Sequence, residues 1–460
     1  MDVPQRSVPH IDELRNFYVG KDINDVPKPA VVLDRAKMRR HCQSLSEAVD
    51  SLGVNFRAHV KTHKTGEGVR IQAGKSGKDI KLVASTIAEF EFLLPVLKEF
   101  KDNGRAVNML YGIPLPPSQV SRLAAVGRQL GPGSISVLID NVAQLTHLTR
   151  FYDEAGFAAG VYLKVDTGYH RAGLPPSQLN KSDLISESMG LEQKGKAYFI
   201  GLYSHSSLSY NDSTQKQAMA NLEGEIDGCL EALRLNAHLF PKEKEITVSV
   251  GASPQVTAIE NLVSSDGTLS DDAEHLRQTI LRVMNGDPDG FRTKLELHAG
   301  VYSILDVQQL STKSRARLGD DEDEIAISVV AEVCSVYNKN EREQPEALVA
   351  VGVLGLGREP CVSYKGWGII DRNAYSPDSK PDRRLVVERI SQEHCIVSWE
   401  SDEGRRDGLP IPLEVGQTVR IYPNHACITG ALYGWYLVVD EEEGQNGTRV
   451  VDVWVRAGGW

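Results

Sequence analysis

Short apolar runs alternate with longer amphipathic segments through roughly the first two thirds of the chain. Runs bounded by turn residues are typical of strands buried on both faces, and apolar residues three and four positions apart are typical of helices. The pattern predicts strands at 54–60, 80–85, 106–111, 134–139, 160–165, 199–204, 245–250 and 295–298. It predicts helices at 11–18, 35–52, 87–100, 117–130, 142–155 and 214–236.

This alternation predicts an α/β fold in which a parallel sheet closes into a (β/α)8 TIM-type barrel. An open, doubly wound sheet is the alternative. Against it, no Gly-x-Gly-x-x-Gly follows the first strand, where such sheets bind dinucleotides. In a barrel the chemistry lies at the carboxyl ends of the strands, so we expect the functional residues directly after the predicted strands.

The pattern changes near residue 305. Short β-branched runs alternate there with polar turns, which predicts an all-β C-terminal domain. These runs lie at 326–336, 347–353, 385–390, 395–399, 418–421 and 436–439. We expect three parts in the chain: an N-terminal arm at 1–28 that packs on the β-domain, the barrel at 29–304, and the β-domain at 305–460.

Charge and composition narrow the class of partner. The net charge is −11 and the pI is near 5.6, and since nucleic acids and anionic membranes require a basic surface, we expect neither as a partner. The six cysteines are scattered without a Cys-x-x-Cys pair, as in reduced intracellular proteins. No signal segment and no apolar run of membrane-spanning length is visible, so we expect a cytoplasmic protein.

Residues 56–65, Phe-Arg-Ala-His-Val-Lys-Thr-His-Lys-Thr, are unusually basic for a predicted strand. In strand periodicity Arg57, His59, Lys61 and His63 share one face, because side chains alternate. Burying such groups unpaired costs several kcal/mol, so we expect the strand to end in a polar cavity. An amine held there can have a lowered pKa and form a Schiff base with an aldehyde cofactor. A solvated edge strand is the alternative.

A second polar segment, Lys-Val-Asp-Thr-Gly-Tyr-His-Arg-Ala-Gly at 164–173, follows the strand at 160–165. Its tight exit turn needs the conformational freedom of Gly168. We expect Arg171 to point into the barrel mouth, where an arginine meets a cofactor ring or an acidic group. A surface arginine after a turn is the alternative.

Aromatic residues follow the strand at 199–204. Tyr203 and His205 share a face, and Tyr210 lies just beyond. An aromatic ring can stack on a cofactor ring and a phenol or imidazole can bond to it, although such residues also fill cores.

The loops after the last two strands contain small residues, Gly-Ala-Ser-Pro at 251–254 and His-Ala-Gly-Val-Tyr at 298–302. Barrels commonly bind phosphate in these loops through backbone N–H groups. Ser253 offers a hydroxyl, and Gly300 and Val301 offer backbone amides. We therefore predict a phosphate cradle there.

His425 and Cys427 lie two residues apart in Tyr-Pro-Asn-His-Ala-Cys at 422–427. On a strand they project from the same face, and imidazole with thiolate suits Zn²⁺. Two protein ligands leave positions open, as a catalytic metal requires. A buried cysteine beside a hydrogen-bonded histidine is the alternative.

Together these segments resemble the motifs of the D-serine dehydratase/D-threonine aldolase family, which belongs to the alanine-racemase-like (fold-type III) pyridoxal-phosphate (PLP) enzymes. The Pro-Asn-His-x-Cys segment is most similar to the eukaryotic D-serine dehydratase branch of this family, and for the chain as a whole we expect a fungal member of that branch. The resemblance implies that Lys61 carries PLP and that His425 and Cys427 bind Zn²⁺. It implies a cofactor site formed by Lys61, Arg171, Tyr203, Tyr210, Ser253, Gly300, Val301 and Tyr302. The chain departs from the family at Ala252 and Val301, although backbone donors survive such changes.

The resemblance also implies an activity, the β-elimination of D-serine to pyruvate and ammonia by a PLP- and zinc-dependent lyase. Lys61 would remove the α-proton, PLP would take up the electrons and Zn²⁺ would stabilise the departing hydroxide. A D-threonine aldolase and a non-catalytic PLP-binding protein are the alternatives. We expect a homodimer whose small-molecule substrate is a D-amino acid.

Overall fold

The computed structural model of the 460-residue chain describes residues 9–74, 77–263, 269–286, 290–376, 383–400, 408–443 and 447–460. The chain divides into two compact units. The barrel unit comprises 43–300, 314–316 and 459–460, and the β-rich unit comprises 1–42, 301–313 and 317–458. None of the helices in the described ranges combines the length and apolar character needed to cross a membrane.

Eight parallel strands close the barrel in chain order, and the last pairs with the first. The predicted TIM-type fold is therefore confirmed. The strands are β2 (Asn55–His59), β3 (Ile80–Ala84), β4 (Val107–Pro114), β5 (Ile135–Ile139), β6 (Ala159–Lys164), β7 (Ala197–Tyr203), β8 (Glu245–Val250) and β9 (Arg292–Ala299). Each coincides with a predicted run, because a parallel strand covered on both faces is a nearly continuous apolar segment.

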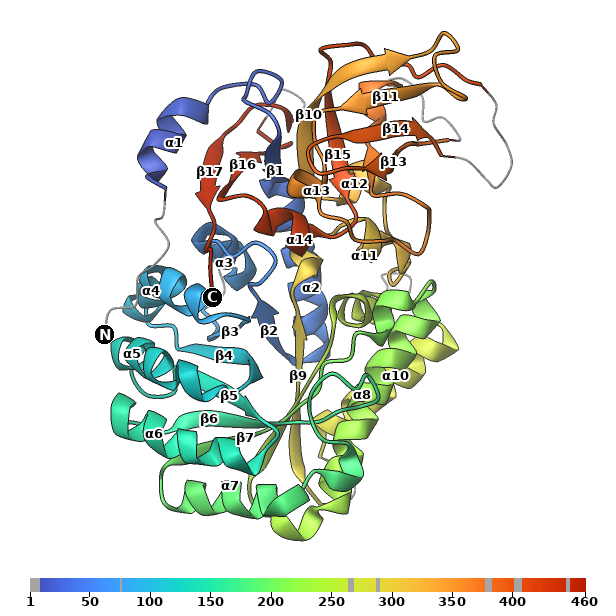
Figure 1. The fold of residues 1–460 in the computed structure, drawn as a ribbon. Helices are drawn as coiled ribbons and strands as arrows, with labels where there is room; N and C mark the ends of the chain where they lie inside the picture. Colours follow the sequence, from blue (N-terminus) through green and yellow to red (C-terminus); the bar gives the residue numbers. More distant parts are fainter. Residues whose placement is uncertain are drawn as a thin grey trace. The chain divides into compact units, whose positions relative to one another are not determined.

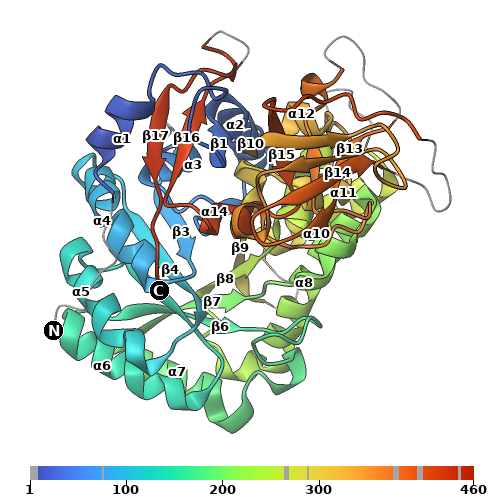
Figure 2. The same cartoon turned by 45° about the horizontal axis from the view of Figure 1, so that its top comes forward.

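Helices surround the barrel strands on the outside (Figures 1 and 2). They are α3 (Gly66–Ala73), α4 (Ile87–Asp102), α5 (Val120–Leu130), α6 (Leu145–Ala155), α7 (Leu184–Gln193), α8 (Gln215–Leu235) and α10 (Asp271–Met284). The short helix α9 (Ser253–Thr257) is buried and follows β8, and α2 (Arg35–Leu52) contains residues of both units. The pattern does not predict α3, α7, α9 and α10. Both α3 and α7 contain glycine, which lowers helix propensity by roughly 1 kcal/mol per residue.

The barrel interior combines an apolar layer with a polar one. Val83, Leu110, Leu138, Tyr162 and Tyr203, from five successive strands, form one buried cluster. Charged side chains of β2 and β9 lie in the same interior and are described with the site below. A barrel of this size is filled by side chains, so each interior position is contacted from several strands.

The β-rich unit is built on a nine-stranded sheet in the order β11-β14-β13-β12-β15-β10-β1-β16-β17. Its strands are β1 (Ala30–Asp34), β10 (Ile327–Tyr337), β11 (Glu346–Val349), β12 (Gly368–Ile370), β13 (Leu385–Ile390), β14 (Cys395–Trp399), β15 (Thr418–Pro423), β16 (Trp435–Val439) and β17 (Asp452–Val455). Among the described residues of this unit, four short helices interrupt the predicted all-β region: α11 (Val307–Ser311), α12 (Asp321–Glu324), α13 (Val353–Leu356) and α14 (Ala426–Ala431).

Strand β1 belongs to the β-rich unit, although the barrel was expected to start at residue 29. It pairs antiparallel with β10 and parallel with β16, so it is an inner strand of the nine-stranded sheet. Val31, Val32 and Leu33 are fully buried there. An apolar run indicates a buried strand but does not indicate which sheet the strand joins, and the sequence pattern therefore misassigned it.

The N-terminal arm is described from residue 9, and residues 1–8 of the expected arm lie outside the described ranges. Helix α1 (Ile11–Tyr18) has the predicted bounds and packs against β17. Arg15 Nε donates to Asp452 Oδ1 at 2.7 Å, and Asp22 forms a backbone bridge with Arg449. These contacts attach the arm to the β-rich unit.

Gly201 in β7 supplies a test of the barrel packing. A Cβ atom there would lie 1.9 Å from the Thr247 carbonyl oxygen of β8, and a closed barrel gives that backbone no room to move. We expect Gly201→Ala to lower the free energy of unfolding by about 3 kcal/mol, as for an overpacked core. Urea denaturation measures this value.

Gly224→Ala is the matched control. Gly224 lies on the exposed side of α8, and a Cβ atom there meets no atom within 4 Å. The exchange should raise stability by roughly 0.5–1 kcal/mol through helix propensity. Equal stability of the two variants would contradict the described pairing of β7 with β8.

Candidate active site

Lys61 lies directly after β2, at the carboxyl end of the barrel strands. The strand ends at His59, where the chain turns. Of the four residues expected on one strand face, only Arg57 and His59 therefore belong to the strand, and the expectation is wrong for Lys61 and His63. The turn is closed by the bond from the Lys64 N–H to the Val60 carbonyl, with Lys64 at a φ of +54°. Strand periodicity therefore ends two residues before the lysine that the sequence singled out.

The two lysines of this turn have different surroundings. Lys64 Nζ lies 3.0 Å from Oε1 of the fully buried Glu89, so that amine is committed to an ion pair. The half-buried Lys61 has no ion pair within the described part of the barrel unit. Of the two amines, Lys61 is therefore the one available for chemistry.

His63 stabilises the turn and does not face the barrel interior. Its Nδ1 accepts a hydrogen bond from the Thr65 N–H at 3.1 Å, so Nε2 carries the proton and donates to Gln72 Oε1 at 3.0 Å. The same glutamine donates to the His59 carbonyl at 3.2 Å. His63 thus connects α3 to the end of β2.

Three histidines gather at the carboxyl ends of β2, β7 and β9. The ring centroids of His59, His205 and His298 lie 5.6–5.8 Å apart, and one nitrogen of each ring lies within 4.8 Å of the others. Burial lowers the pKa of each well below the ordinary value, and the positive charge of Lys61 adds to this in all three. The cluster is therefore neutral at physiological pH.

Tyr203 connects two of these histidines. Its ring stacks on His298 with a centroid distance of 4.2 Å and an interplanar angle of 3°, and its hydroxyl lies 3.3 Å from His59 Nε2. The sequence pointed to Tyr203, His205 and His59 but gave no role to His298. Pairing of Arg57 with His298 across β2 and β9 is a long-range contact that local spacing does not reveal.

Arg57 is neutralised inside the barrel by Glu296 of β9, with Nε at 2.8 Å from Oε1. Lys81 of β3 and the Tyr162 hydroxyl also contact this carboxylate, at 3.0 and 3.1 Å. Burial would raise the pKa of Glu296, but Arg57 and Lys81 lower it to about 2. The charges on β2 are therefore buried and paired, as a low-dielectric interior requires.

The loops after β8 and β9 approach each other and β2 closely. Ser253 Oγ accepts a hydrogen bond from the Gly300 N–H at 3.2 Å. A Cβ atom on Gly300 would lie 2.8 Å from the Cβ of His59, and one on Gly251, at a φ of +142°, would lie 2.5 Å from the His298 carbonyl oxygen. Only glycine fits at these two positions, so the close approach of the two loops to β2 and β9 depends on the absence of a side chain there.

Glu225 of α8 fixes the loops after β7 and β8. No motif in the sequence indicates this role. Its carboxylate accepts hydrogen bonds from the backbone N–H groups of Ser206, after β7, and of Gly251, after β8, the latter at 2.8 Å. Burial raises the pKa of Glu225 from 4.5 to about 7, although Lys164 and these two amides oppose the shift.

Arg171 and Tyr210 lie in the loops after β6 and β7. Arg171 is exposed, donates to Ser207 Oγ at 3.4 Å and lies over the Tyr169 ring, 5.1 Å from its centroid. Tyr210 is half-buried in a short 3-10 turn (Leu208–Asn211). Arg171 is thus held beside the loop after β7 rather than within the barrel interior.

Val301 and Tyr302 form a short 3-10 turn (Val301–Ser303) directly after β9, and both are buried. The Tyr302 hydroxyl accepts a long hydrogen bond from the Cys42 thiol, with 4.0 Å between sulfur and oxygen. Burial raises the pKa of Cys42 to about 12, so the thiol keeps its proton.

His425 and Cys427 lie together in the β-rich unit, but not on a strand as expected. Strand β15 ends at Pro423, His425 is the N-cap residue of α14, and Cys427 is in the first helical turn. Asp306 fixes this turn by accepting a hydrogen bond from the Ala426 N–H at 2.8 Å. The helix begins because a buried carboxylate satisfies its first amide, which local periodicity does not reveal.

The pair is electrostatically coupled. Burial would lower the pKa of His425, but Cys427 and Asp306 raise it to about 9. His425 Nδ1 is buried and has no hydrogen-bond partner among the described residues. An imidazole and a thiol at one helix start, with a free ring nitrogen, form a donor set that suits a borderline-soft divalent cation.

Comparison with known proteins gives matches over nearly the whole chain. Residues 33–264 match the family described as alanine racemase, N-terminal domain, and residues 326–439 match the putative serine dehydratase domain. The chain is 32% identical over 453 residues to D-serine dehydratase of Schizosaccharomyces pombe, covering 98% of this chain and 96% of that protein. It is 28% identical over 438 residues to D-serine dehydratase of Dictyostelium discoideum, covering 92% and 95%.

Among solved structures, the chain resembles D-threo-3-hydroxyaspartate dehydratase from Delftia sp. HT23, with a TM-score of 0.69 and 25% identity. The match covers 96% of this chain and all of the other. A cysteine-to-alanine variant of that enzyme is described in a metal-free form.

The raised pKa of Glu225 predicts a pH dependence of stability. The folded chain keeps this proton up to about pH 7, whereas an unfolded carboxyl releases it near 4.5, so stability falls as pH rises between these values. The drop is about 3 kcal/mol at most. We expect Glu225→Gln to remove this part of the profile, measured by urea unfolding at pH 5 and pH 8.

The exposed Glu231 on the same helix provides the control. Glu231→Gln should keep the profile of the wild-type chain. If Glu225→Gln left the difference between pH 5 and pH 8 unchanged, Glu225 would not be the proton-holding group.

Proposed function

This chain belongs to the D-serine dehydratase family of alanine-racemase-like enzymes, and from this premise we propose that it is a PLP- and zinc-dependent D-serine dehydratase. The reaction converts D-serine to pyruvate and ammonia. The observation that carries the proposal is Lys61: an amine without an ion pair in the described barrel unit, beside a neutral histidine cluster at the carboxyl end of β2. The homodimer and the cytoplasmic location expected from the sequence stay predictions.

The barrel unit fits PLP on two observations. The buried atoms His59 Nδ1 and His298 Nε2 have no hydrogen-bond partners among the described residues. The close approach at Gly251 and Gly300 leaves room for backbone but not for side chains. Lys61 would hold the cofactor through its amine. The Ser253 hydroxyl, which accepts a hydrogen bond from the Gly300 N–H, would donate its own O–H to the phosphate. When bound, PLP supplies an acceptor for the electrons released at the substrate α-carbon.

Lys61 also supplies the base. A primary amine can take the α-proton of the substrate when it is unprotonated. Lys64 does not compete, because Glu89 holds its ammonium. Loss of the α-proton and of the β-hydroxyl together removes water from D-serine. The resulting enamine takes up water and yields pyruvate and ammonia, so the atoms balance.

The β-hydroxyl is the difficult leaving group, and His425 with Cys427 would hold the metal that assists it. A divalent cation lowers the pKa of bound water from about 15.7 to about 7, which corresponds to an upper bound of about 12 kcal/mol for hydroxide departure. Among first-row cations, imidazole with thiolate favours zinc. The metal-free form of the related dehydratase supports a metal in this branch. That the cation and Lys61 act on one substrate stays a prediction.

Exchange of the two lysines tests the cofactor role. We expect Lys61→Ala to abolish the visible absorbance of bound PLP and to lower pyruvate release from D-serine by at least about 10⁴-fold, because both covalent attachment and the base are lost. Lys64→Ala should keep the absorbance, although loss of the ion pair with Glu89 lowers stability. Absorbance spectra of both purified variants measure the difference. Retention of the PLP spectrum by the Lys61 variant would rule out this lysine.

Removal of the metal tests the second half of the proposal. We expect chelation or Cys427→Ala to stop pyruvate release while PLP absorbance remains, since the two groups have separate ligands. Added Zn²⁺ should restore turnover of the chelated chain but not of the variant. Cys334→Ala, an exposed cysteine of the same unit, is the control.

Two outcomes would contradict the proposal. Full turnover of a chain shown by metal analysis to be zinc-free would remove the metal role. Glycine and an aldehyde as products from a β-hydroxy D-amino acid, in place of a 2-oxo acid and ammonia, would identify an aldolase instead.

A further inference from the structure

His298 is fully buried at the end of β9, yet its Nε2 atom has no partner among the described residues. Burial first, and then His205 and Lys164, lower its pKa well below the ordinary value, so the ring is neutral. A neutral imidazole has one N–H and one lone pair. Which nitrogen holds the proton decides whether Nε2 presents a donor or an acceptor to the barrel mouth.

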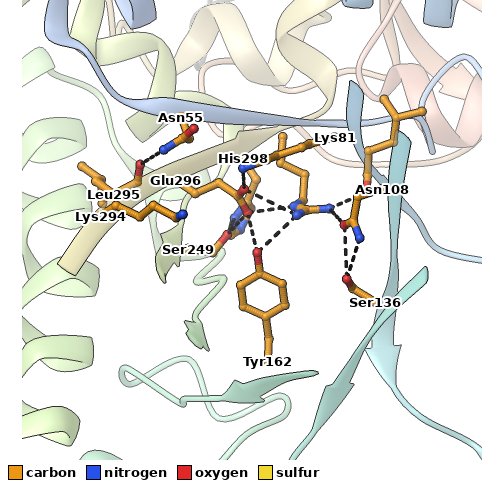
Figure 3. A network of polar contacts seen from close by, with 12 residues as sticks. Asn55, Lys81, Asn108, Ser136, Tyr162, Ser249, Lys294, Leu295, Glu296 and His298 are labelled. Atoms are coloured by element: carbon orange, nitrogen blue, oxygen red, sulfur yellow. Dashed lines mark hydrogen bonds and ion pairs between the residues drawn. The ribbon is translucent and has the colours of Figure 1, made fainter. Parts of the chain in front are cut away.

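Ser249 of β8 decides this question. Its hydroxyl lies 3.0 Å from Glu296 Oε1 and 3.2 Å from His298 Nδ1 (Figure 3). Glu296 is ionised and accepts only, because its pKa is held at about 2. The single O–H of Ser249 therefore points at Glu296, and only a lone pair remains for Nδ1. His298 must donate from Nδ1, which leaves Nε2 as an acceptor.

The other tautomer is disfavoured on two counts. It would set the Nδ1 lone pair against a lone pair of Ser249 Oγ at 3.2 Å. It would also leave an N–H at Nε2 buried and unpaired, which is costly in a low-dielectric interior. The hydrogen-bond network therefore assigns the proton of His298 to Nδ1.

Glu296 acts here by orientation and not by charge. Arg57 and Lys81 already surround its carboxylate, so the group of three has a net positive charge and cannot supply a negative one to His298. Tyr162 donates to the same oxygen as Ser249, at 3.1 Å. These contacts fix the orientation of the Glu296 carboxylate, and the carboxylate in turn fixes the direction of the Ser249 O–H.

His205 is fixed in the same tautomer by different atoms. Its Nδ1 lies 2.5 Å from the Gly251 carbonyl oxygen, which can only accept, so Nδ1 carries the proton and Nε2 does not. The Gly251 N–H is in turn bound by Glu225 at 2.8 Å. Two acceptor nitrogens, from β9 and from the loop after β7, thus belong to one cluster.

We propose that Ser249 and Glu296 are positioning residues that hold His298 in the Nδ1–H tautomer, so that His298 Nε2 accepts a hydrogen bond from the protonated ring nitrogen of the cofactor. The inference rests on the proposed function, because it requires PLP in the barrel. The phosphate and the phenolic oxygen of PLP accept hydrogen bonds, whereas the ring nitrogen, once protonated, donates one. Arg171 is unsuited to this partner, since a guanidinium has no acceptor.

A protonated ring nitrogen makes the cofactor a better acceptor of electrons, which a β-elimination requires. Residues that stabilise the proton on the ring nitrogen of the cofactor therefore influence the reaction without contacting the substrate. Ser249 and Glu296 act through His298 and are not catalytic themselves.

The first experiment measures the tautomer alone. The cofactor-free full-length chain is labelled with ¹⁵N-histidine, and the ring signals of His298 are identified by their loss in His298→Gln. We expect the wild-type spectrum to show an unprotonated Nε2 and a protonated Nδ1. In Ser249→Ala we expect a mixture of tautomers, because Nδ1 has lost its acceptor. A protonated Nε2 in the wild-type chain would overturn the inference.

The second experiment measures the bond to the cofactor. Dissociation constants are determined for PLP and for its 1-deaza analogue, which lacks the ring nitrogen. We expect wild type to prefer PLP by about tenfold, the equivalent of one hydrogen bond of about 1.4 kcal/mol, and Ser249→Ala to lose most of this preference. An unchanged preference in Ser249→Ala would overturn the acceptor role.

Ser136→Ala is the matched control, since Ser136 of β5 is buried in the same network but contacts Asn108 rather than His298. It should keep both the wild-type tautomer and the wild-type preference, and thermal unfolding checks that each variant is folded. A loss of preference in Ser136→Ala equal to that in Ser249→Ala would overturn the specific role of Ser249. If wild type bound neither ligand, the proposed function and the acceptor role would both fail, whereas the nitrogen spectrum would still decide the tautomer.

Discussion

Closure of the barrel between β2 and β9 is the constraint on which the site depends. The two strands are the first and last of the barrel, and their pairing sets Arg57 opposite His298 and Ala58 opposite Ala299. This register brings His59, the turn with Lys61, His298 and the Gly300 loop to one edge. It joins residues near position 60 to residues near position 300. The amine and the proposed phosphate cradle are neighbours because the sheet has no free edges.

The same closure creates an electrostatic problem, because it buries charged side chains. Arg57 and Glu296 are both fully buried, and each alone would cost several kcal/mol. The barrel resolves this with one connected network in which the carboxylate is contacted by Arg57, Lys81, Tyr162 and Ser249. The histidines above it stay neutral, since burial and nearby cations both oppose their protonation. A polar but uncharged cluster can thus border a reactive amine.

Local patterns predicted the elements well and their long-range partners poorly. Each barrel strand coincided with an apolar run, and α1 had the predicted bounds, because these features depend on neighbouring residues only. The sequence could not show that β1 joins the nine-stranded sheet, that Glu296 neutralises Arg57, or that Glu225 fixes the loops after β7 and β8. His425 and Cys427 were predicted on a strand, but the carboxylate of Asp306, more than a hundred residues earlier, starts a helix there. The resemblance to a family identified Lys61, whereas the ion pair of Lys64 with Glu89 explains physically why the other lysine is unsuited.

The position of β1 has a consequence for biosynthesis. Ala30 pairs with Val330 and Val32 with Leu437, so an inner strand of the sheet waits for partners from the far end of the chain. During translation the barrel strands leave the ribosome before the sheet can assemble, and β1 presents an unpaired apolar edge throughout that interval. Loop closure over such distances is slow, which delays the burial of this edge. The price of joining both ends of the polypeptide in one sheet is therefore a long period of exposure before the native state is reached.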